Sequence, residues 1–187
     1  MGARPTALDV VRRVRATELA RVYRIFRATL PNISPRTCRY HLTRERGVYV
    51  LDVRGVGVAG FYIATLKDSS TTLWVEYLGV DPEHQGRGLG RVLVEHCERL
   101  GRDVGSARVG LRPRDAGAQA FYERLGYVAE GPLEDGHPRL YKPLQKGARL
   151  ACDPRSLLGR YNLTNPFGAV IVTVRCVLLA AVVTNRR

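Results

Sequence analysis

The sequence predicts an α+β fold, because both strand-like and helix-like patterns recur along the chain. Short apolar runs rich in valine and aromatic residues alternate with stretches whose apolar residues recur at helical spacing. In chain order these segments read strand, helix, helix, three strands, helix, strand, helix and two strands. A chain of 187 residues can bury one substantial core, so we expect one domain with an appendage.

The first half of the chain is expected to hold four strands and two helices. Residues 10–14 alternate weakly and predict a first strand. A helix begins at Thr17 and Glu18, carries apolar residues at helical spacing, and ends at Pro31. A second, shorter helix covers 36–44. The remaining strands are expected at 48–53, 58–66 and 73–80, with glycine-containing or polar turns between them.

The second half begins with a long helix from Leu89 to Leu100, whose apolar residues form an i, i+3, i+4, i+7 stripe. Residues 101–106 are expected to break it. A strand at 107–111 follows, and then a helix that starts at Asp115 and closes at Gly126. Segments 127–130 and 138–144 complete the prediction as a last hairpin.

Residues 80–90, Val-Asp-Pro-Glu-His-Gln-Gly-Arg-Gly-Leu-Gly, join a predicted strand to a predicted helix. Glycines let the backbone approach a ligand closely, and the start of a helix adds a positive dipole end. The stretch is not a P-loop, because no Lys-Ser or Lys-Thr follows, and its glycine spacing differs from a dinucleotide fingerprint. It predicts a site for a phosphate-bearing cofactor; a plain tight turn is the alternative.

Gln85-Gly-Arg-Gly-Leu-Gly90 resembles the Gln/Arg-x-x-Gly-x-Gly/Ala signature of the GCN5-related N-acetyltransferases (GNAT family), and residues 80–83 match the usual lead-in. Asp115 to Tyr127 is similar to that family's second motif. The resemblance covers residues 8–144. It implies the GNAT acyl-CoA N-acyltransferase fold, with a mixed central sheet flanked by helices in three α/β/α layers, and acetyl-CoA as the cofactor. We therefore expect an N-acetyltransferase domain at 1–144 and a basic and apolar C-terminal extension of unknown role at 145–187.

The resemblance also implies which residues hold acetyl-CoA. Main-chain amides of the glycine turn would bind the diphosphate, and the pantetheine arm would lie along the end of the preceding strand, where main-chain N–H groups would polarise the thioester carbonyl. Asp115 stands where the family usually has Asn, and a carboxylate can only accept hydrogen bonds. The expected cofactor-binding residues are Leu78, Gly79, Val80, Gln85, Gly86, Arg87, Gly88, Leu89, Gly90, Arg91, Asp115 and Tyr122.

Two residues are candidates for proton transfer. Tyr122 matches the family tyrosine that protonates the departing thiolate; a core aromatic is the alternative. Glu76 is the sole acid of the predicted strand 73–80, and strict alternation would place it on one face with Trp74 and Leu78. If that face is buried, desolvation would raise the pKa of Glu76 and make it a base for the amine. An exposed strand carboxylate is the alternative reading.

The formal net charge of +13 comes almost entirely from arginine. Such a charge attracts anions, including coenzyme A phosphates, nucleic acid and acidic proteins; a merely basic surface is the alternative. Four scattered cysteines offer neither a paired metal-ligand motif nor a disulfide framework, so we expect no metal and reduced thiols. The N-terminus lacks the apolar segment of a secretion signal, which favours the cytoplasm.

Residues 24–46, where this family usually builds its acceptor pocket, hold six arginines and a single acid, Glu45. We infer that polycationic acceptors are disfavoured, because like charges repel. An N-acetyltransferase acting on a small-molecule or peptide amine is the leading interpretation. An acyl-CoA-binding module with little catalysis, and a nucleic-acid-associated acetyltransferase, are the alternatives. The sequence leaves open a homodimer.

The C-terminal segment 168–183 is strongly apolar and rich in valine. It is shorter than the roughly 20 residues that span a bilayer, and Arg175 lies at its centre. A β-hairpin, an intersubunit strand or a disordered extension fits this composition better than a membrane span.

Overall fold

The computed structural model describes residues 9–44, 47–67, 71–134 and 137–145. The predicted C-terminal extension, including segment 168–183, therefore lies outside the described residues, apart from Gln145. Within the described ranges, no helix is long and apolar enough to cross a membrane.

The order of strands and helices is the predicted one, with two short 3-10 turns added. The strands are β1 (Val10–Arg13), β2 (Val48–Val53), β3 (Gly57–Lys67), β4 (Thr72–Val80), β5 (Arg108–Leu111), β6 (Val128–Glu134) and β7 (His137–Pro143). The helices are α1 (Leu19–Thr29), α2 (Pro35–Arg44), α3 (Leu89–Asp103) and α4 (Ala116–Arg124), with 3-10 turns η1 (Ala16–Glu18) and η2 (Pro82–His84).

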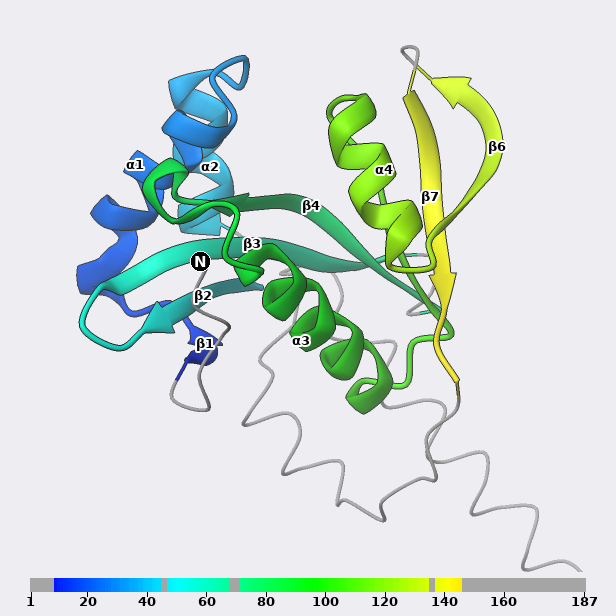
Figure 1. The fold of residues 1–187 in the computed structure, drawn as a ribbon, viewed down its shortest axis with the longest axis horizontal. Helices are drawn as coiled ribbons and strands as arrows, with labels where there is room; N and C mark the ends of the chain where they lie inside the picture. The colour runs from blue at the N-terminus through cyan, green and yellow to red at the C-terminus, as the bar shows by residue number, and fades with distance from the viewer. Residues whose placement is uncertain (1–8, 45–46, 68–70, 135–136, 146–187) are drawn as a thin grey trace, which may run out of the picture.

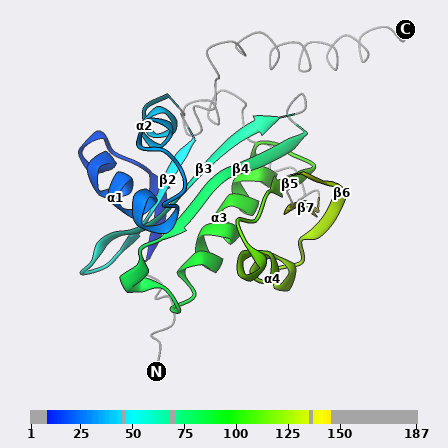
Figure 2. The same ribbon diagram turned by 90° about the horizontal axis from the view of Figure 1, so that it is seen from above.

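The helices cover both faces of the sheet, which confirms the predicted three layers (Figures 1 and 2). Helices α1 and α2 pack on one face through a cluster that includes Phe26, Leu42 and Phe61. Helices α3 and α4 pack on the other face, where Leu93 and Tyr122 belong to a second cluster. Each helix buries one apolar stripe against the sheet, as its sequence period requires.

The described strands form one sheet in the order β1-β2-β3-β4-β5-β7-β6. Strands β4 and β5 are parallel, whereas every other neighbouring pair is antiparallel. Their pairing runs only from Thr72↔Arg108 to Val75↔Leu111, and β5 then ends while β4 continues to Val80. The last residues of β4 therefore have no β5 partner on that side. This separation of β4 from β5 opens a slot in the sheet.

A β-bulge lies in the middle of β4. Ile63 of β3 faces Tyr77, whereas Ala64 faces Val75, so Glu76 is the extra residue. The extra residue reverses the alternation: Leu78 packs against the same cluster as Leu73, although one residue number is even and the other odd. The predicted common face of Trp74, Glu76 and Leu78 is therefore wrong, because strict alternation holds only in a regular strand.

Helix α3 also differs from its prediction. It continues through Gly101 to Asp103 instead of breaking after Leu100. Gly101 is buried, and a Cβ atom there would lie 2.6 Å from Leu144 Cδ1. The glycine is thus required by close packing against β5 and the residue after β7, and the helix tolerates its intrinsic cost of roughly 1 kcal/mol.

Candidate active site

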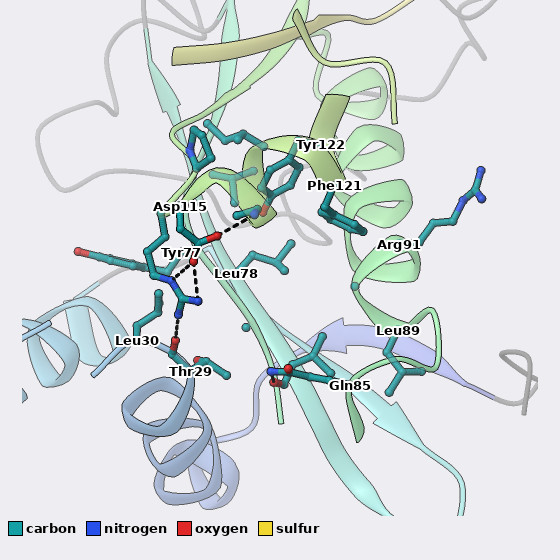
Figure 3. Close-up of a pocket in the computed structure, with 18 of the residues that line it drawn as sticks. Thr29, Leu30, Tyr77, Leu78, Gln85, Leu89, Arg91, Asp115, Phe121 and Tyr122 are labelled. Atoms are coloured by element: carbon teal, nitrogen blue, oxygen red, sulfur yellow. Dashed lines mark hydrogen bonds and ion pairs between the residues drawn. The ribbon is translucent and has the colours of Figure 1, made fainter. Parts of the chain in front are cut away.

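A cavity of about 500 Å³ lies where β4 and β5 separate (Figure 3). Its walls come from the end of α1, the second half of β4, the glycine turn, the loop after β5 and the first turns of α4. The cavity thus collects segments that are far apart in the sequence. The predicted site residues among its lining are Glu76, Leu78, Gly79, Val80, Gln85, Gly86, Gly88, Leu89, Gly90, Arg91, Asp115 and Tyr122.

The glycine turn uses its glycines for backbone conformations that other residues rarely adopt. Gly86 and Gly88 have φ angles of +75° and +79°. Gly88 is the N-cap of α3, where no side chain of the described residues caps the helix and no acid lies in its first turn. A helix start has N–H groups without intrahelical partners, and these attract anions. The turn therefore presents main-chain donors, as a diphosphate site requires.

Asp81 fixes the turn to the body of the protein. Its buried carboxylate accepts a hydrogen bond from the Glu83 N–H at 3.2 Å, and its Oδ2 lies 2.6 Å from Arg21 Nη2. Arg21 also donates to the Val58 carbonyl at 3.3 Å. Asp81 and Arg21 are 60 positions apart. Our sequence reasoning missed Arg21, and no local signal distinguishes it from its neighbouring arginines.

The polar side chains of the turn are mostly held by the protein itself. Gln85 Nε2 donates to the Val80 carbonyl at 3.0 Å, which joins the turn to the end of β4. Arg91 pairs with Glu95 at 3.0 Å on the exposed side of α3. Arg87 is exposed and lies outside the cavity lining, with Nη2 3.5 Å from the Glu83 carbonyl. Main-chain amides, more than these side chains, are thus placed to hold an anion.

Gly79 lies where α1 crosses the end of β4. A Cβ atom there would lie 2.6 Å from Thr29 Oγ1 and 2.8 Å from Phe61 Cε1. Any side chain would push α1 away from the strand, because atoms cannot approach so closely. Glycine at this position lets Thr29 and Leu30, at the end of α1, form one wall of the cavity.

Tyr122 lies on the α4 side of the cavity and is only 8% exposed. Its ring packs edge-on against Phe121 and Tyr127, with centroid distances of 5.1 and 5.6 Å. Burial raises the pKa of Tyr122 well above its usual value of 10, with a smaller contribution from Cys97. The phenol therefore keeps its proton and is available as a donor, while its ring also belongs to the core.

Glu76 lies at the bulge of β4 and lines the cavity. Its side chain is 23% exposed. The Oε1 atom accepts a hydrogen bond from Thr65 Oγ1 at 3.0 Å and pairs with Lys67 Nζ at 2.9 Å. The carboxylate thus reaches the cavity with a cation beside it, rather than in the apolar surroundings that the sequence argument assumed.

Asp115 caps α4, as predicted: its Oδ1 accepts a hydrogen bond from the Ala118 N–H at 2.8 Å. Its Oδ2 pairs with Arg114, whose Nε and Nη2 lie at 2.9 and 2.8 Å. The Ala118 N–H, followed by Arg114, holds the pKa of Asp115 below its usual value. Arg114 Nη1 in turn donates to the Thr29 carbonyl. Sequence reasoning missed this link, which crosses from the α4 wall to the α1 wall.

The described residues contain no group of three or more His, Cys, Asp or Glu side chains that could hold a metal ion. The donors at the cavity are instead main-chain N–H groups, a phenol and arginines. This set fits a cofactor with a diphosphate and an extended arm, because the turn supplies the anion site and the slot beside β4 supplies free strand edge.

The model of the Acetyltransferase (GNAT) family matches residues 19–127. The chain is 29% identical over 94 residues to streptothricin acetyltransferase of Streptomyces lavendulae, covering 45% of this chain and 50% of that protein. It is 38% identical over 72 residues to the ribosomal protein bS18-alanine N-acetyltransferase of Escherichia coli (strain K12), covering 37% and 47%. The chain thus spans about half the length of these curated relatives.

Solved structures show the same fold. The ribosomal-protein-S18-alanine N-acetyltransferase of Escherichia coli superposes with a TM-score of 0.61 at 23% identity, over 78% of this chain and all of that one. The PaiA N-acetyltransferase of Thermoplasma acidophilum, solved in complex with coenzyme A, gives a TM-score of 0.59 at 13% identity, over 72% and 98%. The family match covers more than half of the chain and spans both the glycine turn and α4. The chain therefore belongs to the GNAT family of acetyltransferases.

Proposed function

We propose that the domain formed by residues 1–144 transfers an acetyl group from acetyl-CoA to a primary amine of a small molecule or peptide, by direct attack of the amine. The observation that carries the proposal is the uncapped start of α3 at Gly88, facing a slot where β4 continues without a β5 partner. A diphosphate and an extended thioester arm need these two features side by side. Buried free thiols at Cys38 and Cys97 favour the cytoplasm as the compartment.

Binding of the cofactor is assigned mainly to the main chain. The N–H groups between Gln85 and Arg91 hold the diphosphate, with Arg87 and Arg91 adding positive charge nearby. The edge of β4 at Leu78, Gly79 and Val80, which has no β5 strand partner, aligns the arm. An N–H group near Leu78 or Gly79 polarises the thioester carbonyl. Oxyanion donors of this kind typically contribute roughly 3–4 kcal/mol to a barrier reduction.

Two side chains manage protons in this proposal. The amine nitrogen bonds to the carbonyl carbon, the carbon–sulfur bond breaks, and Tyr122 gives its proton to the departing thiolate. The raised pKa of Tyr122 keeps that proton available across the working pH range. Glu76 takes the proton of the amine, directly or through water, from its place at the cavity wall. Lys67, which pairs with Glu76, orients the carboxylate.

The test combines thiol release with acetyl-CoA binding in the full chain. Tyr122→Phe should lower kcat by about 10²–10⁴, the usual contribution of general acid catalysis, with little change in the Kd of acetyl-CoA. Tyr127→Phe is the matched control, because Tyr127 is buried against Tyr122 but lies outside the cavity lining. If the chain binds acetyl-CoA but releases no coenzyme A thiol with any amine tested, it is instead a binding module.

A further inference from the structure

The cavity has two ends with different surroundings. In Figure 3, Leu89 and Arg91 lie on one side of Leu78, whereas Thr29, Leu30 and Asp115 lie on the other. The first end belongs to the proposed diphosphate turn. The second end, where Arg114 contacts both Asp115 and Thr29, is where an acceptor would approach. The charges and hydrogen-bond donors at this second end should therefore determine which amines bind.

Each carboxylate of the cavity lining already has a cation. Glu76 is paired with Lys67 at 2.9 Å, and Asp115 is paired with Arg114 at 2.8 Å. A polycationic acceptor needs carboxylates for its second and third positive charges, and a carboxylate held by an internal cation offers less attraction. Helices α1 and α2, beside this end, contribute further arginines and no acid. Among the described residues, the cavity lining therefore offers a polycation no carboxylate that lacks a cation partner.

Arg114 is held in a fixed position at this end. Its Nε donates to Asp115 Oδ2, its Nη2 lies 2.8 Å from the same oxygen in an ion pair, and its Nη1 donates to the Thr29 carbonyl. A guanidinium carries five N–H donors, and these three contacts use at most three of them. A guanidinium that is already oriented loses little entropy when it binds a further oxygen. Arg114 thus combines a rigid placement with donors left for a ligand.

We propose that Arg114 binds an oxygen atom that the acceptor carries close to its amine, and so selects amino acids or peptide α-amino groups over simple amines and polyamines. Both kinds of acceptor carry an amine next to a carboxylate or carbonyl oxygen. This inference rests on the acetyl transfer proposed above. Asp115 supports this selection indirectly, because its Oδ2 orients Arg114 while its Oδ1 caps α4.

The experiment measures kcat/KM of the full chain with saturating acetyl-CoA for L-alanine, L-alanyl-glycine, ethylamine and spermidine. The first two carry an oxygen near the amine, and they separate a free carboxylate from a peptide carbonyl. We expect at least one of them to exceed both ethylamine and spermidine by about tenfold or more, the value of a charge-assisted hydrogen bond. Ethylamine or spermidine as the best acceptor would overturn the proposal.

Arg114→Gln should lower the ratio of kcat/KM values between the oxygen-bearing acceptors and the simple amines to within about threefold of one, because the charged donor is lost. Arg114→Lys, which keeps a charge without the fork, should retain part of it. Arg102→Gln, an exposed change near the end of α3, is the charge-matched control. A purely structural role for Arg114 would lower all four acceptors together and leave their ratios unchanged, which would also overturn the proposal. Absence of transfer to every amine would refute the proposed function itself and this inference with it.

Discussion

The N-termini of α3 and α4 both line the cavity, but only the N-terminus of α4 is capped by a side chain of the described residues. Helix α3 begins at Gly88, in a left-handed conformation, with no side-chain cap from the described residues. Helix α4 begins after Asp115, whose carboxylate accepts a hydrogen bond from Ala118 N–H at 2.8 Å. One helix start thus keeps its N–H groups for a ligand, and the other uses its own carboxylate. In the proposed function, this difference assigns the cofactor phosphates to α3 and leaves α4 to shape the acceptor end.

The largest effect is expected when the start of α3 is given an acidic residue like the one that caps α4. Gly88→Asp would place a negative charge among the amides proposed for the diphosphate, and Asp tolerates a left-handed conformation better than most residues. We expect acetyl-CoA binding to weaken by on the order of 10²-fold or more, measured by calorimetry. Gly88→Asn, with the same shape and no charge, should lose much less. Equal losses in both variants would show that shape, and not charge, decides binding.

Gly86 and Gly105 form a matched pair for separating backbone strain from ligand contact. Their φ angles are +75° and +76°, and an added Cβ would meet no atom within 4 Å at either position. Both alanine variants should lose about 1 kcal/mol of unfolding free energy, because the left-handed conformation is strained. Gly86→Ala alone should weaken acetyl-CoA binding, by about tenfold, since only Gly86 lines the cavity. Comparable binding by the two variants would contradict the assignment of the turn.

The cap of α4 should contribute to stability rather than to cofactor affinity. Asp115→Ala removes the acceptor for Ala118 N–H and should cost about 1 kcal/mol of unfolding free energy, whereas Asp115→Asn should cost little, because Asn caps helices equally well. Urea denaturation measures both variants. Because Asn cannot pair ionically with Arg114, Asp115→Asn should nevertheless lose acceptor selectivity. A large stability loss in the Asn variant would show that the ion pair, not the cap, holds this loop.

A pH-dependent effect on stability concerns how α3 is held against the sheet. His96 of α3 is half-buried, with its Nδ1 2.8 Å from Tyr62 Oη, and burial, followed by Arg99, lowers its pKa from 6.5 to about 4. Between these values the unfolded chain binds a proton that the folded chain does not, so stability should fall as pH drops from 6.5 toward 4. His96→Gln removes this contribution. Thermal unfolding at pH 7 and pH 5 should show a shallower acid decline in the variant, and identical declines would exclude the role of His96.

The order of the elements could be predicted from the sequence because each depends on local patterns. Periodic apolar residues mark α1 and α3, and the segment from Asp115 to Gly126 contains both the cap and the end of α4. The glycine turn could also be predicted, because in the proposed function a short continuous stretch of backbone binds the diphosphate. The resemblance of two motifs was enough to assign the family that the comparisons then confirmed.

What could not be predicted depends on contacts between distant segments. The bulge at Glu76 arises from pairing with β3, and a sequence read by strict alternation places Leu78 on the wrong face. The pairing of Glu76 with Lys67 requires the β3–β4 hairpin to be formed. The bond from Arg114 to the Thr29 carbonyl joins positions 85 residues apart, so no local pattern could indicate it.

The ion pair between Arg21 and Asp81 has a mechanical consequence. Arg21 lies on α1, the same helix whose last residue, Thr29, lines the far end of the cavity, while Asp81 caps the 3-10 turn that leads into the glycines. One buried carboxylate therefore ties the turn to the helix that ends in the far wall of the cavity. The spacing between these two walls is thus set by a contact within the protein itself.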